Sequence, residues 1–171
     1  LDRNNTFLLY KKNWRGINID ISNFSIDLFK FLRPDDLNLN VAISNNDGEV
    51  TFYYQKKLSQ LSTIKKDIAS ERMQGHISEK KIKSNKLTTI LDNSKFKNKK
   101  IDFLNIDIEG ADFEALKSLN FEIYRPKLIC VEIYGEAINQ SEIFIFLKKL
   151  NYTKKWSATF SHLFTDDFYK F

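Results

Sequence analysis

Apolar residues recur along the chain with two spacings, one typical of strands and the other typical of helices. Short apolar runs with the length of buried strands lie at residues 16–21, 38–44, 101–108 and 127–133. Segments whose apolar side chains recur at helical spacing lie at residues 24–32, 112–119 and 141–150. The alternation of strands and helices predicts an α/β fold built on a doubly wound, mostly parallel sheet.

The end of the chain carries the signals of one capped helix and a closing hairpin. Ser141 stands at the start of the helix expected over residues 141–150, where its hydroxyl can accept a hydrogen bond from a backbone N–H of the first turn. Residues 152–159 and 162–171 are expected to pair as antiparallel strands. We therefore expect a C-terminal antiparallel hairpin to complete the sheet.

A turn and a basic insertion interrupt this pattern. Residues 45–48 indicate a turn, and residues 49–54 form a β-branched and aromatic strand that is expected to pair with residues 38–44. Residues 56–84 have few apolar positions and many charges. They predict a variable insertion that contains one short helix near residues 59–72.

The positive charge of the chain is concentrated around this insertion. From Lys56 to Lys100 there are thirteen Lys or Arg against four Asp or Glu, whereas the whole chain has a formal net charge of +5. Such a stretch can attract nucleic acid, an anionic lipid or a nucleotide sugar. Because lysine is abundant throughout and no aromatic residues interleave residues 65–86, a solvated lysine surface is the favoured interpretation, and nucleic acid is not expected as a partner.

Length and composition set the class of protein. The 171 residues, with 42% hydrophobic positions, suit a single domain over residues 1–171 with a sizeable core. No apolar run approaches the length of a membrane span, and the single Cys130 has no Cys partner for a disulfide. We expect a soluble, cytoplasmic protein. Because the chain starts at Leu1 rather than Met, we expect that residues precede it in the natural protein.

Acidic side chains stand at the ends of the predicted strands, where a doubly wound sheet binds its ligands. Asp20 ends the first strand, and a carboxylate there can accept hydrogen bonds from a ribose diol or cap the following helix. Asp107 and Glu109 flank Ile108, so that strand alternation would point both carboxylates to one side. Such a pair suits a general base, a cation site or a group facing a sulfonium, although Glu109 can instead cap the next helix.

Two further strand ends carry polar groups. Glu132 is a charge inside the apolar run of residues 127–133. Because burial of an unpaired acid is costly, either the strand ends there or the carboxylate has a functional role. Ser44 follows the predicted strand over residues 38–44 and belongs to a turn by default, although the backbone there can border a ring edge.

Other chemically versatile side chains are expected to have structural roles. His76 and His162 are expected to be surface or hydrogen-bonded residues rather than catalysts. The aromatic residues expected to pack in the core or at edges, rather than form a substrate platform, are Trp14, Tyr53, Tyr54, Trp156 and Phe160.

Residues 101–132, IDFLNIDIEGADFEALKSLNFEIYRPKLICVE, resemble the signature of the FkbM family of methyltransferases. That signature is an apolar strand ending in D-x-E-G-A, a helix, then R-P and a short apolar strand that reaches a glutamate. The matching residues are Asp107, Glu109, Gly110, Ala111, Arg125, Pro126 and Glu132. Residues 5–20 and 39–53 resemble further segments of the family, and the likeness weakens over residues 56–84 and the final hairpin.

The resemblance implies a class I, Rossmann-like methyltransferase fold that uses S-adenosyl-L-methionine, usually to methylate a hydroxyl of a sugar, glycan, lipid or natural-product scaffold. By this analogy Asp20 would hold the ribose hydroxyls, and Ile43 and Ser44 would border the adenine. Asp107 and Glu109 would face the methyl-donor end.

We expect Glu132 to act with Asp107 and Glu109 as the catalytic carboxylates. Asp107 also counts among the cofactor-binding residues, and no metal ligand is assigned, although Asp107 and Glu132 could together hold a divalent cation.

The family's glycine-rich loop on the first strand is not found in residues 1–171, so we expect the first strand and its loop to be missing from this chain. Two other functions remain open. One is a nucleic-acid methyltransferase recruited through the lysine-rich segment, and the other is a catalytically silent binding module.

Overall fold

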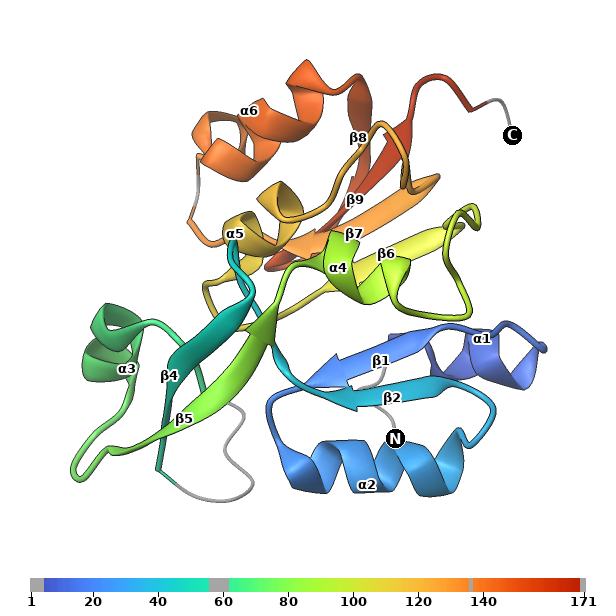
Figure 1. The fold of residues 1–171 in the computed structure, drawn as a ribbon. Helices are drawn as coiled ribbons and strands as arrows, with labels where there is room; N and C mark the ends of the chain where they lie inside the picture. Colours follow the sequence, from blue (N-terminus) through green and yellow to red (C-terminus); the bar gives the residue numbers. More distant parts are fainter. Residues whose placement is uncertain (1–4, 56–61, 136, 170–171) are drawn as a thin grey trace. The chain divides into compact units, whose positions relative to one another are not determined.

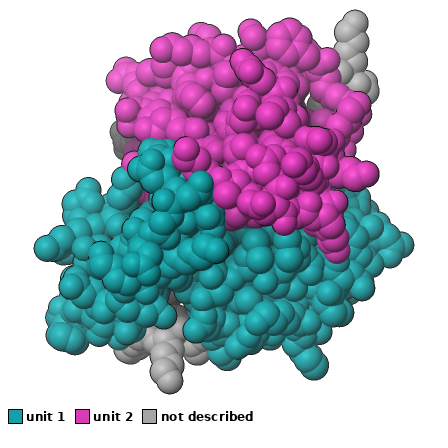
Figure 2. All heavy atoms as spheres, viewed as in Figure 1, with its two compact units in different colours: residues 1–85 teal, residues 86–171 magenta. Residues whose placement is uncertain are grey.

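The chain divides into two compact units, which are described separately below. The computed structural model describes residues 5–55, 62–135 and 137–169. The N-terminal unit comprises residues 1–85 and the C-terminal unit residues 86–171, coloured teal and magenta in Figure 2. That the chain is one methyltransferase domain stays a prediction.

The N-terminal unit begins with a short helix and a β-α-β arrangement. Helix α1 (Phe7–Lys11) precedes strand β1 (Ile17–Asp20), helix α2 (Asn23–Leu32) and strand β2 (Leu37–Asn40). Strands β1 and β2 pair in parallel, and α2 lies along them (Figure 1). The predicted first strand and its following helix are therefore confirmed, whereas the sequence pattern had not indicated α1.

Helix α2 buries a different face from the one that its largest apolar residues mark. Ile26 is the buried side chain of the helix. Phe24, Leu28 and Phe31, whose spacing indicated the helix, are exposed. The helix begins where expected because the Ser22 hydroxyl accepts a hydrogen bond from the backbone N–H of Ser25 at 3.4 Å.

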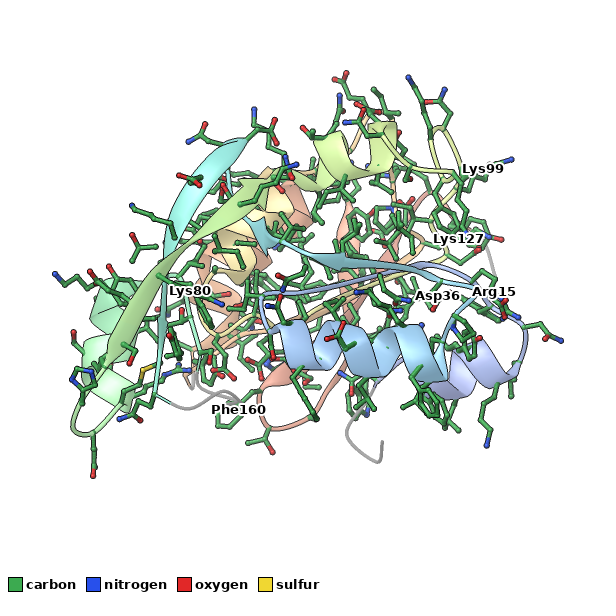
Figure 3. The ribbon with its side chains drawn as sticks, turned by 60° about the horizontal axis from the view of Figure 1, so that its bottom comes forward. Arg15, Asp36, Lys80, Lys99, Lys127 and Phe160 are labelled. Carbon is green, nitrogen blue, oxygen red and sulfur yellow. The ribbon has the colours of Figure 1, made fainter. Side chains whose placement is uncertain are left out.

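A buried ion pair ties β1 to β2. The Asp36 carboxylate accepts hydrogen bonds from Arg33 Nε at 2.8 Å, from the Gly16 backbone N–H at 2.8 Å and from Asn18 Nδ2 at 3.1 Å. The Asp36 side chain is fully buried. Asp36 and the exposed Arg15 are labelled in Figure 3. Because each acceptor bond reaches a different segment, this carboxylate fixes the entry of β1 against β2.

The second sheet of this unit corrects the expected pairing. Strands β3 (Ala42–Ile43), β5 (Ser78–Asn85) and β4 (Gly48–Tyr54) lie in the order β3-β5-β4. The expectation that residues 49–54 pair with residues 38–44 is wrong, because β5 lies between β3 and β4 and pairs with both.

The expected insertion at residues 56–84 therefore contributes a central strand. In β5 the buried Ile82 faces Val50 of β4 in register and joins Ala42 and Phe52 in a small core. The short helix predicted near residues 59–72 is present as α3 (Lys66–Arg72), and residues 59–61 of that prediction lie outside the described residues.

The C-terminal unit contains a four-stranded mixed sheet. Strand β6 (Phe103–Ile106) pairs in parallel with β7 (Leu128–Glu132), β7 pairs antiparallel with β9 (Ser161–Asp166), and β9 pairs antiparallel with β8 (Tyr152–Ser157). The predicted C-terminal hairpin is confirmed as β8 and β9, although residues 170 and 171 lie outside the described residues.

The remaining elements of this unit are α4 (Leu87–Asp92), α5 (Asp112–Lys117), the short 3-10 helix η1 (Ile138–Gln140) and α6 (Glu142–Lys149). Ser141 caps α6 as predicted, since its hydroxyl accepts a hydrogen bond from the Phe144 backbone N–H at 3.1 Å. The fully buried core residues of this unit include Leu116, Tyr124, Ile129, Val131, Leu147 and Phe164. The α/β class is thus confirmed. The described strands form three sheets, so the expected single doubly wound sheet is not confirmed.

Candidate functional site

The segment after β6 forms a tight turn that a buried carboxylate holds from inside. Glu109 and Gly110 both have positive φ angles, of 52° and 90°. Asp112 Oδ1 accepts a hydrogen bond from the Ile108 backbone N–H at 3.3 Å, and its Oδ2 accepts one from the Gly110 N–H at 3.0 Å. Because glycine adopts positive φ without a steric penalty, Gly110 permits this turn and Asp112 stabilises it.

Asp107 and Glu109 are grouped by this turn rather than by the alternation of side chains along a strand. Strand β6 ends at Ile106 and Glu109 has a positive φ angle, so strand alternation does not place the two carboxylates on one side. They are related instead through the turn, and both lie near enough to Glu132 to raise its pKa. The expected grouping of these acids is therefore supported by a different geometry.

Glu132 ends β7 beside this turn. The parallel register pairs Ile106 of β6 with Val131 of β7, so the residues that follow, Asp107 and Glu132, emerge at the same end of the two strands. The Tyr134 hydroxyl donates a hydrogen bond to Glu132 Oε2 at 2.7 Å. Glu132 is thus a half-buried carboxylate held in a defined orientation at the carboxyl end of the sheet.

Burial and neighbouring charge change the acidity of this group. Burial is the largest cause that raises the pKa of Glu132 to about 7, and the negative charges of Asp107, Asp112 and Glu109 add to the rise, while the Tyr134 hydrogen bond opposes it. Burial likewise raises the pKa of Asp112, where hydrogen bonds from backbone N–H groups act in the opposite direction. Glu132 can therefore take up and release a proton near neutral pH.

Cys130 lies on β7 near the same carboxylates. Burial raises the pKa of its thiol, and the negative charges of Asp107 and Glu132 raise it further. Because a thiolate is disfavoured in such surroundings, Cys130 has the character of a neutral, packed side chain rather than of a nucleophile.

Asp20 lies in the N-terminal unit at the end of β1. Its Oδ1 accepts a hydrogen bond from the Ser22 backbone N–H at 2.7 Å, immediately before α2. Burial raises the pKa of Asp20, whereas hydrogen bonds from Ser22 and Ser25 lower it. Asp20 therefore supports the start of α2, which was the alternative to ribose binding, and its role toward a cofactor stays a prediction.

Ile43 and Ser44 lie at the end of β3 in the same unit. The Ile43 side chain is buried. The Ser44 hydroxyl donates to the Asn46 backbone oxygen at 2.7 Å and accepts from the Asn46 N–H at 3.3 Å, so that it stabilises the expected turn. Contact of these residues with an adenine stays a prediction.

A comparison with protein families bears directly on these carboxylates. The model of the methyltransferase FkbM domain matches residues 2–154. The chain belongs to the FkbM methyltransferase domain family. No curated protein and no solved structure was found to match this chain. The strand, turn, helix and strand that carry Asp107, Glu109 and Glu132 all lie within the matched range.

Two residues of the FkbM domain complete the site without having been singled out from the sequence. Asp112 had been assigned only to the start of a helix, and Tyr134 had not been considered. The signal for Asp112 is an acid two positions after Gly110, where its side chain can accept from the backbone of the turn. Tyr134 carries no such local signal, because its hydrogen bond to Glu132 depends on where β7 ends.

His162, one of the two histidines expected to be structural, is buried in the C-terminal unit. His162 Nδ1 lies 2.9 Å from the Ser157 hydroxyl, and its Nε2 lies 3.4 Å from the Ile133 backbone oxygen. Burial lowers the pKa of His162, so the neutral ring is favoured. With both nitrogens engaged, His162 links β8, β9 and the end of β7.

The described residues contain neither a metal-binding cluster nor a membrane-spanning helix. Within residues 5–55, 62–135 and 137–169, no group of three or more His, Cys, Asp or Glu is placed to hold a metal ion. Over the same part of the chain, no helix has the length and apolarity that crossing a membrane requires.

Proposed function

We propose that this FkbM domain transfers a methyl group from S-adenosyl-L-methionine to a hydroxyl oxygen of a sugar, glycan, lipid or natural-product scaffold. The observation that carries this proposal is Glu132, whose pKa is raised to about 7 beside Asp107 and Glu109. An alcohol that gains a methyl group must lose its proton. A carboxylate with a pKa near the working pH is suited to accept that proton.

The three carboxylates have separable roles in this proposal. Glu132 accepts the proton of the reacting hydroxyl, while Asp107 and Glu109 accept hydrogen bonds from neighbouring hydroxyls of the acceptor and so orient it. Asp112 holds the turn that carries the latter two, through its bonds to Ile108 and Gly110. Much of the acceleration in such a reaction comes from alignment of donor and acceptor, so residues that fix this turn are expected to affect the rate.

Residues of each unit, taken separately, suit one part of a cationic, ribose-containing cofactor. When bound, S-adenosyl-L-methionine supplies an electrophilic methyl group on a positively charged sulfur. The negative charges of Asp107 and Glu109 suit that charge. In the N-terminal unit, the Asp20 carboxylate suits the ribose hydroxyls and residues 43 and 44 suit an adenine edge, by analogy with dinucleotide folds.

Cofactor binding tests the proposal directly. Calorimetric titration of the full-length protein with S-adenosyl-L-methionine is expected to show binding, which Asp20→Asn weakens about tenfold or more because a hydrogen bond to a charged acceptor is lost. Asp27→Asn is the matched control, since Asp27 lies on the exposed side of α2, where it bonds Lys30 at 3.0 Å. A folded wild-type protein that binds no cofactor would indicate a silent binding module instead.

A further inference from the structure

Two exposed aromatic rings form a pair beside Glu132. The ring centroids of Tyr134 and Phe160 lie 4.9 Å apart with an interplanar angle of 39°. Tyr134 is 41% exposed and Phe160 is 46% exposed. Single exposed aromatic residues are common on protein surfaces, but two exposed rings in contact beside a carboxylate make a candidate contact surface.

The pair is held by the backbone on both sides. The Ile133 N–H donates to the Phe160 backbone oxygen at 2.9 Å, and Glu132 lies opposite Ser161 in the β7–β9 register. Phe160, labelled in Figure 3, lies in the loop between β8 and β9. Phe160 directly precedes β9, and Tyr134 follows the end of β7 by two residues, so both rings are anchored close to paired strands.

The charge around the rings restricts what can bind there. Tyr134 donates to Glu132 Oε2 at 2.7 Å, and Glu132 in turn lies near the negative charges of Asp107 and Glu109. A phosphate or carboxylate placed on the rings would meet these charges and be repelled. The surface therefore favours an uncharged ligand that offers an apolar face to the rings and hydroxyl donors to the carboxylates.

We propose that Tyr134 and Phe160 form the platform on which an uncharged sugar ring of the methyl acceptor packs, with its hydroxyl groups directed to Glu132. A sugar ring suits this surface because its C–H face can pack against the negative face of an aromatic ring while its hydroxyls donate to a carboxylate. This assignment builds on the methyltransferase function proposed above and names the residues and the class of acceptor.

Saturation-transfer NMR on the full-length protein tests the platform with defined probes. The methyl glycosides of glucose, galactose and mannose are offered separately, and at least one is expected to receive saturation at its ring C–H protons. Phe160→Ala is expected to weaken that binding about two- to tenfold, the range for loss of one aromatic contact. Phe31→Ala, which removes an exposed phenyl ring from α2, is the matched control and is expected to bind as the wild type.

A second set of variants distinguishes the role of the Tyr134 ring from that of its hydroxyl. Tyr134→Phe keeps the aromatic face but frees Glu132 Oε2 of its hydrogen bond, so sugar packing is expected to persist. Tyr134→Ala is expected to weaken binding as Phe160→Ala does. Circular dichroism of each variant shows whether it is folded, and a variant that does not fold is replaced by Phe160→Ser or Tyr134→Ser.

The outcomes distinguish this inference from the function on which it builds. Cofactor binding without binding of any of the three glycosides would overturn the platform and leave the methyltransferase proposal standing. Glycoside binding that is unchanged in both alanine variants, or tighter binding of adenosine monophosphate at these rings, would also overturn it. Glycoside binding without cofactor binding would contradict the methyltransferase proposal instead.

Discussion

The buried carboxylate of Asp112 accepts a hydrogen bond from the backbone N–H of Gly110 at 3.0 Å, two positions earlier in the chain. Its other oxygen accepts from Ile108, so one side chain that is 3% exposed closes the whole turn between β6 and α5. Glu109 lies inside this turn with a positive φ angle. The orientation of Glu109, a candidate catalytic carboxylate, thus depends on the buried carboxylate of Asp112.

Asp112→Asn is expected to destabilise the folded protein by about 1–3 kcal/mol. The amide has only one acceptor oxygen, so one of the two backbone N–H groups of this half-buried turn loses its partner. Urea unfolding measures the change. Asp167→Asn, at an exposed position in the same unit, is the control and should stay within about 0.5 kcal/mol of the wild type. Equal stability of the two variants would show that the turn does not need Asp112.

Asp107→Asn is expected to abolish methyl transfer while leaving the fold intact. The side chain is exposed, so the substitution removes a charge from the site without opening the core. Transfer of labelled methyl groups from S-adenosyl-L-methionine by the full-length protein provides the measurement, with circular dichroism as the check on folding. Near-normal methylation by this variant would refute the role assigned to Asp107.

The same variant is expected to lower the pKa of Glu132 below its value of about 7. The negative charge of Asp107 is one of the causes that raise it, so removing that charge favours the ionised form of Glu132. NMR titration of labelled glutamate carboxyl groups follows this shift, with the exposed Glu122 as an internal reference. An unchanged Glu132 titration would mean that burial alone sets its acidity.

The contribution of Glu132 to stability is expected to fall as pH rises from about 4.5 to about 7. Glu132 has a pKa raised from 4.5 to about 7 in the folded chain, so the folded state binds more protons than the unfolded state between these values. Its favourable contribution is present below the unfolded pKa and is lost as pH rises through the folded pKa. Thermal unfolding of wild type and Glu132→Gln at pH 4.5 and pH 8 isolates this group, because the glutamine variant should lack that part of the pH dependence.

Loss of the carboxylate from the buried Arg33–Asp36 ion pair is expected to reduce stability far more than loss of the carboxylate from the exposed Arg15–Asp35 pair. Asp36→Ala leaves the buried Arg33 without its carboxylate and is expected to destabilise by about 3–5 kcal/mol. Asp35→Ala removes an ion pair to Arg15 whose Asp35 side chain is 58% exposed, and it is expected to change stability by less than about 1 kcal/mol. Similar losses in both variants would contradict the importance of burial at Asp36.

Local patterns were sufficient for most of the elements around the candidate site. The apolar runs that became β6 and β7, the Ser141 cap of α6 and the β8–β9 hairpin are all confirmed. These signals work because burial of a strand and capping of a helix each depend on residues that are close together in the chain. The D-x-E-G-A motif indicates Asp107 and Glu109 as candidate residues from the sequence alone.

Pairing and acidity, by contrast, depend on residues that are distant in sequence. Strand β5 has a single buried apolar side chain, Ile82, among lysines, and it becomes a strand because β4, about thirty residues earlier, supplies its hydrogen-bond partners. The pKa of Glu132 is set by burial and by charges from the turn after β6, which no spacing along the chain reveals. Composition and periodicity thus specify elements and candidate residues, whereas long-range packing determines which strands meet and which carboxylate can exchange a proton near neutral pH, because both depend on three-dimensional proximity.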